Sequence, residues 1–305
     1  SCPHRSRPLS SLKVLPMKFA FFILKLLGKL PHSALRALAR LLGWLCYWLV
    51  APRRKVGQIN LALCFPEKSQ AERDQILRQH FYHMALLVLE YGKYWYAPAA
   101  ELRQMVRYQD KHILDQALAA GEKVILLYPH FTAFEAAVYA LNQDVPLISV
   151  YSHQKNPTLD AQILHGRHRY NNVFLVGRTE GLRSIIKHIR SESAPFLYLP
   201  DQDFGRKDSI FADFFGIPTA TITGLSRIAG MTKAKVIPAI PTRNADNTVT
   251  LRFYPTWENF PSDDVVADTQ RMNDFIEARV RENPEQYFWL HKRFKTRPEG
   301  EQGFY

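Results

Sequence analysis

The 305-residue sequence has few cysteines and lacks the short motifs of several common enzyme classes. Only Cys2, Cys46 and Cys64 occur, an odd and scattered set that favours a reducing compartment over a disulfide framework. The sequence has no Gly-x-Ser-x-Gly elbow, no Walker A loop, no Gly-x-Gly-x-x-Gly turn and no Cys-x-x-Cys pair. These absences argue against serine-elbow hydrolases, P-loop nucleotide enzymes, Rossmann dehydrogenases and zinc ribbons.

Acidic residues are too few to balance the basic ones. Lys and Arg number 40 against 28 Asp and Glu, which gives a net charge of +12. This excess predicts an acidic partner: nucleic acid, an anionic membrane surface, or an acidic protein or phosphorylated substrate. A hydrophobic content of 47% predicts a packed core, and the length fits one sizeable α/β domain or two modest ones.

Long uninterrupted apolar runs are also missing, but two interrupted ones open the chain. Residues 14–30 carry lysines at helical spacing, and residues 33–51 carry Trp44, Tyr47 and Trp48 before three consecutive basic residues. We interpret 1–52 as a membrane-associated helical region, either one span at 33–51 or two helices lying in the interface. A cleaved signal peptide and a pair of buried core helices are the weaker alternatives.

Beyond residue 53, short β-branched runs alternate with helical patterns. Ser69 to Glu72 form a capping box, which opens a long helix. The alternation predicts an α/β domain over 53–305, with a mostly parallel central sheet flanked by helices and a site at the carboxyl ends of the strands. The candidate strands are 124–128, 146–151, 173–176, 195–199, 235–240 and 248–253. The helical patterns that alternate with them are 109–120, 133–143, 158–170, 180–191, 222–231 and 264–283.

A histidine follows the first of these candidate strands. His130 comes directly after Pro129, and Glu135 lies five positions further on. Histidine titrates near neutrality and can act as a general base, and a carboxylate can orient it and stabilise its charged form. On one straight helix the two side chains would be about 140° apart, so a dyad requires a turn between them.

Other polar clusters follow later strands. Asp201 and Asp203 lie in a strand-end loop, where they either cap backbone amides or orient a ligand. Arg167 and Arg178 flank the strand at 173–176 and either hold phosphate or form a solvated basic face.

Two further patterns have competing interpretations. The pairs His80/His83 and His165/His168 have metal-ligand spacing but no nearby third ligand, so we expect packing histidines and no metal. The basic, aromatic segment 289–299 resembles either a nucleic-acid groove or a basic rim for an anionic lipid or an acidic carrier.

Together these residues resemble the bacterial late lipid A acyltransferases of lauroyl and myristoyl type, within the glycerolipid-acyltransferase superfamily. The resemblance covers most of the chain. The motifs are His130-x4-Glu135, RKVGQINLALCFPE at 54–67, YLPDQDFG at 198–205, DFFGIPTAT at 213–221 and PEQYFWLHKRFKTRPEGE at 284–301. One departure occurs at 151–157, where the family often has Tyr-Arg-Pro-Asn and this chain reads YSHQKNP. The departure removes an arginine and puts acceptor binding by this loop in question.

The resemblance implies transfer of a fatty acyl group from acyl carrier protein to a hydroxyl of an anionic lipid A precursor. The precursor supplies the nucleophile, so no cofactor, metal or nucleic acid is expected. The implied location is the cytoplasmic face of the inner membrane. Another lipid acceptor, or a non-catalytic basic binding module, would fit the same sequence less well.

The resemblance also assigns roles to the residues named above. His130 would be the base and Glu135 its partner. Substrate binding would fall to the remaining candidates, which are Arg167, Arg178, Asp201, Asp203, Phe214 and Phe215, with the two phenylalanines in the apolar wall of the acyl chain.

Overall fold

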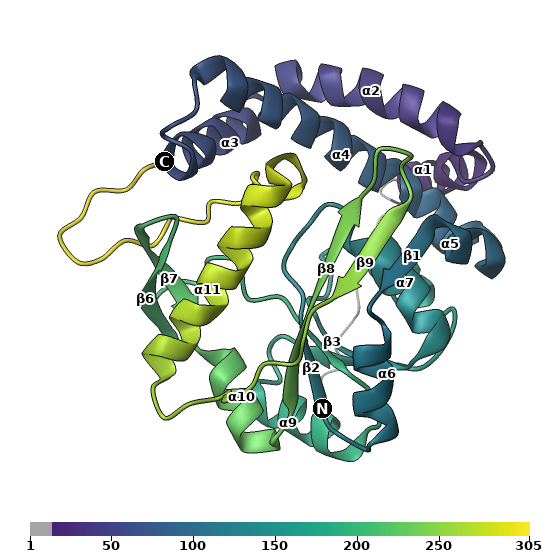
Figure 1. Cartoon of the computed structure of the whole chain (residues 1–305). Helices are drawn as coiled ribbons and strands as arrows, with labels where there is room; N and C mark the ends of the chain where they lie inside the picture. The colour runs from purple at the N-terminus through teal and green to yellow at the C-terminus, as the bar shows by residue number, and fades with distance from the viewer. Residues whose placement is uncertain (1–13) are drawn as a thin grey trace, which may run out of the picture.

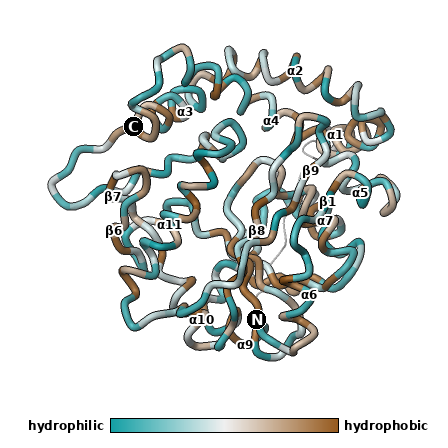
Figure 2. Tube along the Cα trace, in the orientation of Figure 1, coloured by the Kyte–Doolittle hydropathy of each residue, from teal (hydrophilic) through white to brown (hydrophobic). Residues whose placement is uncertain are grey.

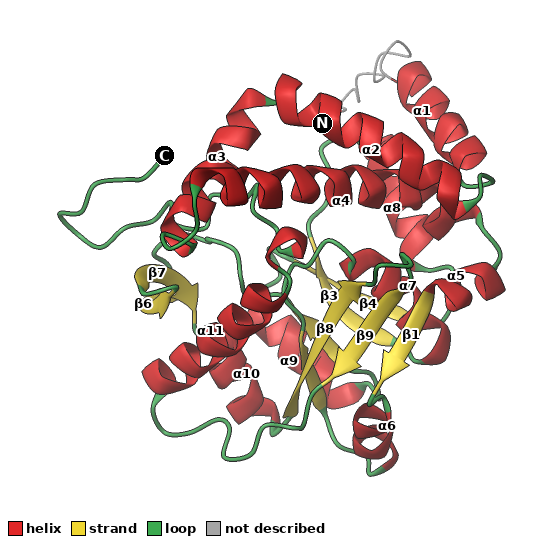
Figure 3. Ribbon diagram, turned by 45° about the horizontal axis from the view of Figure 1, so that its top comes forward, coloured by secondary structure: helices red, strands yellow, loops and turns green. Residues whose placement is uncertain are grey.

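The computed structural model describes residues 14–305 as a central sheet between two layers of helices (Figures 1 and 3). The strands are β1 (Val106–Gln109), β2 (Val124–Leu127), β3 (Leu147–Tyr151), β4 (Val173–Gly177), β5 (Phe196–Tyr198), β6 (Ser209–Phe214), β7 (Ile217–Ile222), β8 (Lys235–Arg243) and β9 (Val249–Phe253). The helices are α1 (Val14–Leu27), α2 (His32–Leu49), α3 (Ala51–Cys64), α4 (Gln70–Tyr96), α5 (Ala99–Met105), α6 (His112–Ala119), α7 (Phe134–Asp144), α8 (Pro157–Arg167), α9 (Leu182–Ser191), α10 (Gly224–Thr232) and α11 (Val265–Glu282), followed by the 3-10 turn η2 (Pro284–Gln286).

Seven of the described strands form the main sheet, in the order β1-β9-β8-β2-β5-β3-β4. All neighbours are parallel except β8 and β9. The predicted α/β fold with a mostly parallel sheet is therefore confirmed. All four residues of β2 are buried, as expected for a strand covered on both faces. Strands β6 and β7 form a separate antiparallel pair.

Two hydrophobic clusters fill the two faces of the sheet. Helices α9, α10 and α11 cover one face, and α5, α6 and α7 cover the other (Figure 1). Helix α4 begins with the predicted capping box, in which Ser69 and Glu72 bond each other's backbone amides. It then crosses the molecule, with Phe81 in the first cluster and Tyr94 in the second.

The sheet opens at one place that matters for the site. Strands β3 and β5 are paired only at Ile148 with Phe196 and at Ser149 with Leu197. Strand β3 continues to Tyr151 alongside β4, and β5 stays beside β2. The carboxyl ends of β3 and β5 thus separate, and ligands of open α/β sheets bind in crevices of this kind.

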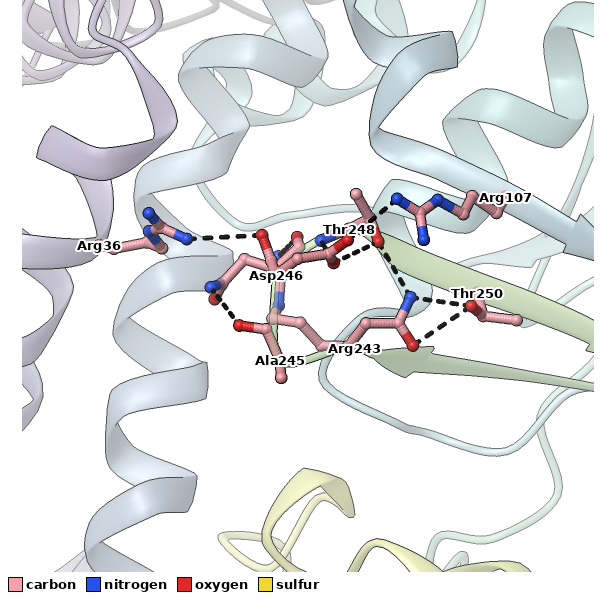
Figure 4. A network of polar contacts seen from close by, with 9 residues as sticks. Arg36, Arg107, Arg243, Ala245, Asp246, Thr248 and Thr250 are labelled. Atoms are coloured by element: carbon pink, nitrogen blue, oxygen red, sulfur yellow. Dashed lines mark hydrogen bonds and ion pairs between the residues drawn. The ribbon is translucent and has the colours of Figure 1, made fainter.

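The N-terminal helices lie on the outer side of α4. Helix α2 packs along α4, and the turn between β8 and β9 reaches it as well, since Arg36 donates to the backbone oxygen of Asp246 at 3.4 Å (Figure 4). The boundary expected after residue 52 falls within the first turn of α3. Among the described helices none alone has the length and hydrophobicity of a membrane span, whereas α2 and α3 together would pass but meet at 90°. Expectations for residues 1–13 lie outside the described residues.

Candidate active site

His130 lies in the turn after β2, as the sequence predicted. The chain bends between Pro129 and α7, and Phe131 donates its backbone N–H to the Pro129 oxygen at 2.8 Å. The C-terminal tail holds this turn from the other side. Thr132 donates to Gln286, and Phe288 donates to the backbone oxygen of His130. A segment about 155 positions away in the sequence therefore fixes the backbone of the histidine.

The ring of His130 is oriented by Asp201. Its Nδ1 lies 2.7 Å from Asp201 Oδ1, and its backbone N–H donates to Oδ2 at 2.8 Å. The Asp201 side chain is 3% exposed and that of His130 is 20% exposed. Burial alone would raise the pKa of Asp201, but the charge and hydrogen bonds of His130 outweigh burial and hold this pKa below its usual value. An ionised Asp201 keeps the proton on Nδ1 and leaves Nε2 as an acceptor.

Glu135 has another partner than the one we expected. It is the second residue of α7, so the required turn is present, but its Oε1 accepts a hydrogen bond from Arg167. Among the described residues the carboxylate that contacts the His130 ring is Asp201, so the orienting contact expected of Glu135 comes from Asp201. Glu135 is 2% exposed. Burial alone would lower the pKa of Arg167, but Glu135 outweighs it and raises this pKa above the usual value.

The crevice between β3 and β5 holds a cavity of about 420 Å³ beside His130. Its polar lining includes Arg167, Arg178 and Gln202. The guanidinium of Arg178 lies 5.0 Å from the centre of the Phe204 ring. The apolar lining is larger, and it comprises Tyr128, Phe134, Val138, Val150, Ile185, Phe196, Leu197, Tyr198, Leu199, Phe204 and Ile222. The cavity therefore combines an apolar chamber with two cations and a histidine.

Asp203 does not line this cavity. Its carboxylate accepts from Thr296 N at 2.7 Å, from Thr296 Oγ1 at 2.9 Å and from Gly205 N at 2.9 Å. Its own N–H donates to His291 Nε2 at 2.8 Å. Asp203 thus ties the strand-end loop to the C-terminal tail, where we had expected it to contact substrate.

Phe214 and Phe215 also lie elsewhere than expected. They are 1% and 9% exposed and pack edge to face at 4.9 Å, beside Trp289 and Phe294 of the tail. Phe214 ends β6 and Phe215 lies in the turn of the β6–β7 hairpin, and both side chains belong to the core. The apolar wall is built instead by Phe134, Phe204 and Ile222, among others. The alternation of side chains along β7 could have identified Ile222 as a lining residue. Phe134 and Phe204 reach the cavity from other segments of the chain, so no local pattern identifies them.

The segment 151–157, which departs from the family pattern, is held by contacts with Asp160. This carboxylate accepts from Tyr151 at 2.6 Å and from the Gln154 N–H at 2.7 Å, and it pairs with the exposed His153. Ser152 of this loop lines the cavity.

The pairs His80/His83 and His165/His168 find no further ligand, and within residues 14–305 no three His, Cys, Asp or Glu side chains form a metal-binding group.

The fold and the site define a class: an α/β protein in which a strand-end histidine, held by a carboxylate, lies beside an apolar cavity. Comparison with known proteins then gives the family, because residues 3–296 match the family described as bacterial lipid A biosynthesis acyltransferase. The chain is 32% identical to a lipid A biosynthesis acyltransferase of Haemophilus influenzae, over 92% of this chain and 87% of the relative. It is 33% identical to the lauroyltransferase of Escherichia coli, with 91% and 90% covered, and 30% identical to the palmitoleoyltransferase of that organism, with 94% and 93% covered. The chain belongs to the lipid A biosynthesis acyltransferases and is an enzyme that transfers acyl groups.

Proposed function

We propose that this enzyme transfers a fatty acyl group from the thioester of acyl carrier protein to a hydroxyl of an anionic lipid A precursor. The observation that carries the proposal is His130, held by Asp201 at the mouth of an apolar cavity. The relatives are named for different fatty acyl groups, and the apolar lining is suited to such a chain. The net charge of +12 suits two acidic partners.

In the proposed mechanism, Nε2 of His130 removes the proton of the acceptor hydroxyl as its oxygen attacks the thioester carbonyl. The imidazolium is stabilised by Asp201, whose pKa is lowered by the same contact. The tetrahedral intermediate collapses with cleavage of the carbon–sulfur bond, and the imidazolium returns its proton to the departing thiolate. An ester and a free carrier thiol result, and His130 is neutral again.

The two arginines of the cavity would bind the anionic groups. Glu135 holds Arg167 at the cavity wall, so we assign Glu135 a positioning role through Arg167. The backbone N–H of Arg178 bonds the Tyr151 oxygen at 2.9 Å, which places this cation beside the loop that lacks the family's arginine. Arg178 would thereby compensate for the departure at 151–157.

The proposed location is the cytoplasmic face of the inner membrane. Exposed apolar side chains on α1 and α2 support membrane attachment, notably Phe19, Phe22, Trp44 and Trp48, which are 53–63% exposed. Basic residues surround them on the same helices. This pattern is typical of helices that lie in a membrane interface.

The decisive experiment is an in vitro assay with purified protein, defined acyl carrier protein thioesters and a tetra- or penta-acylated lipid A precursor. Mass spectrometry should show one acyl group added to the precursor, and His130→Gln should reduce the rate by about 100- to 10,000-fold. Acyl release without precursor would measure hydrolysis by activated water. Undiminished transfer by the His130 variant would overturn the mechanism, and transfer only from another thioester would overturn the donor.

A further inference from the structure

Helix α2 has an inner and an outer face with different chemistry. Its inner residues Leu35 and Ala39 are fully buried against α4. Its outer residues Leu41, Trp44 and Trp48 are 53–59% exposed, with helical spacing between them. Hydrophobic and hydrophilic residues alternate along this helix (Figure 2). An exposed stripe with two tryptophans requires a partner that accepts both apolar and polar contacts.

A cavity of about 300 Å³ lies beside this stripe, between α2 and α4. The helices come very close at Gly43, where an added Cβ would lie 2.7 Å from the Tyr82 Cα. Tyr47 and Trp44 line the cavity from α2. The cavity is therefore bounded by two closely packed helices and sits next to the exposed apolar residues.

Two cations line this cavity, Arg40 from α2 and Arg78 from α4. Neither guanidinium forms an ion pair or a hydrogen bond with any residue in 14–305, and both side chains are exposed. By contrast Arg36, one turn earlier on α2, donates to the β8–β9 turn (Figure 4). The guanidinium carbon of Arg78 lies 5.3 Å from the centre of the Tyr47 ring, and this contact restricts the orientation of the guanidinium group.

The N-terminal helices beside the cavity carry charge of one sign, whereas α4 has Asp74 one turn before Arg78. The sequence has no Asp or Glu before Glu67, so all the Lys and Arg charges of α1, α2 and α3 are without an acidic residue on the same helix. Arg54 lies on the same aromatic pair as Arg78, at 5.3 Å from the Tyr47 ring and 5.4 Å from the Trp48 ring. Guanidinium groups can bind phosphate, and tryptophan favours the boundary between water and an apolar phase. Arginines beside Trp44 and Trp48 therefore suit a phosphate located at such a boundary.

We propose that this cavity binds the phosphate of an anionic glycerophospholipid of the bilayer, with Arg40 and Arg78 as its ligands. Trp44 and Trp48 enter the headgroup layer around it, and Leu41 and Leu49 contact the acyl chains. The occupant is a bilayer lipid because exposed apolar residues adjoin the cavity. A soluble phosphate would leave these apolar residues in water, whereas a lipid would cover them. This site is separate from the cavity at His130. It rests on the proposed membrane attachment but not on the proposed transfer chemistry.

The test compares the full chain with Arg40→Gln/Arg78→Gln in a vesicle-binding assay without donor or acceptor. Phosphatidylcholine vesicles with added phosphatidylglycerol should bind the double variant about 30-fold more weakly than the wild type, which corresponds to about 2 kcal/mol for two interfacial arginines. A matched control is Lys187→Gln/Arg227→Gln, which removes the same charge from exposed positions on α9 and α10. The control should bind like the wild type, and thermal unfolding should show all three proteins folded.

Equal weakening in both double variants would mean diffuse electrostatic attraction and would overturn the site, as would unchanged binding of Arg40→Gln/Arg78→Gln. A second probe is dihexanoyl phosphatidylglycerol as a monomer, titrated by calorimetry. Saturable binding that the Arg40/Arg78 variant loses supports a discrete lipid site. Equally tight binding of inorganic phosphate, or displacement of the lipid by lower concentrations of lipid A precursor, would assign the cavity to another ligand. Because the assays involve no turnover, their failure is distinguishable from a failure of the transfer mechanism.

Discussion

Asp201 holds His130 twice, through the ring Nδ1 at 2.7 Å and through the backbone N–H at 2.8 Å. The two oxygens of one carboxylate thus fix both the position of the residue and the tautomer of its ring. A third element supports the pair, because Tyr287 of the tail donates to the Asp201 backbone oxygen at 3.4 Å. The environment of His130 is therefore assembled from three segments that are far apart in the sequence.

Asp201→Asn should reduce kcat by about 1,000-fold, in the range of a lost general base, with little change in KM. The amide is neutral, so it stabilises the imidazolium less, and its NH₂ group can donate to Nδ1 and move the proton to Nε2. Steady-state kinetics with the thioester and precursor measure the effect. Asp246→Asn, on the β8–β9 turn, is the control and should keep its rate. A kcat near that of the wild type in Asp201→Asn would remove Asp201 from the mechanism.

Glu135 and Arg167 should behave as one unit. In a double-mutant cycle, Glu135→Gln and Arg167→Gln are each expected to raise KM for the phosphorylated precursor, and the double variant should be little worse than the more severe single one. A coupling of about 0.5–3 kcal/mol is typical of residues in contact or in one salt bridge. A precursor without phosphate should show little of this effect.

A second double-mutant cycle, of Glu135→Gln with His130→Gln, decides whether Arg167 or His130 is the functional partner of Glu135. Strong coupling of Glu135→Gln to His130→Gln, with none to Arg167→Gln, would restore the dyad that the His-x4-Glu spacing suggested. The structure leads us to expect the opposite, because the Glu135 carboxylate is bonded to Arg167.

Much of this architecture could be predicted from local patterns. The six predicted strands all occur, with ends shifted by at most three residues, because β-branched runs between helical segments are a strong signal. Strand β1 was missed, since Val106–Gln109 alternates for only four residues. Strands β6 and β7 were not among the predicted strands, because the aromatic residues of 213–221 suggested a binding wall. In the structure they form a hairpin that turns at Phe215 and Gly216, both with positive φ.

The site shows which information a sequence lacks. The positions of His130 and Asp201 at strand ends were predictable, because parallel strands bring their carboxyl ends to one edge. Which carboxylate would contact the ring was not, since Glu135 is near in sequence whereas Asp201 is near only after β5 pairs with β2. The tail contacts of Asp203 depend on the same tertiary arrangement, and charge alone could not separate them from a role in substrate binding.

The length of the acyl chain should depend on Ile222, which lines the cavity at the end of β7. Ile222→Trp adds volume to the chamber, so longer thioesters should lose more activity than shorter ones. One methylene in an apolar pocket is worth about 1–3 kcal/mol, and the ratio of kcat/KM between long and short donors should shift by about 10- to 200-fold. Val266→Trp, an exposed position on α11, is the control. An unchanged ratio would place the acyl chain elsewhere.

Stability should fall as the pH decreases, because buried histidines resist protonation. The pKa of His291 is lowered from 6.5 to about 4, mainly by burial and also by Arg293, although Asp201 and Asp203 act in the opposite direction. Burial also lowers the pKa of His80 to about 4. Below pH 6.5 the unfolded chain binds a proton at each site that the folded chain does not yet accept. The free energy of unfolding therefore decreases with falling pH, by up to about 1.4 kcal/mol per pH unit for each group, until the folded pKa is reached.

His291→Gln isolates one of these contributions. The glutamine oxygen can still accept the Asp203 N–H that His291 Nε2 accepts in the native protein, but it does not titrate. Denaturant unfolding at several pH values between the two pKa values should show a slope reduced by about 1.4 kcal/mol per pH unit relative to the wild type. His153→Gln, whose ring is 71% exposed, is the control and should leave most of the slope in place. If His291→Gln kept the full slope, His291 would have to be accessible to protons in the folded state, and its contact with the Asp203 N–H would not survive at the pH of the measurement.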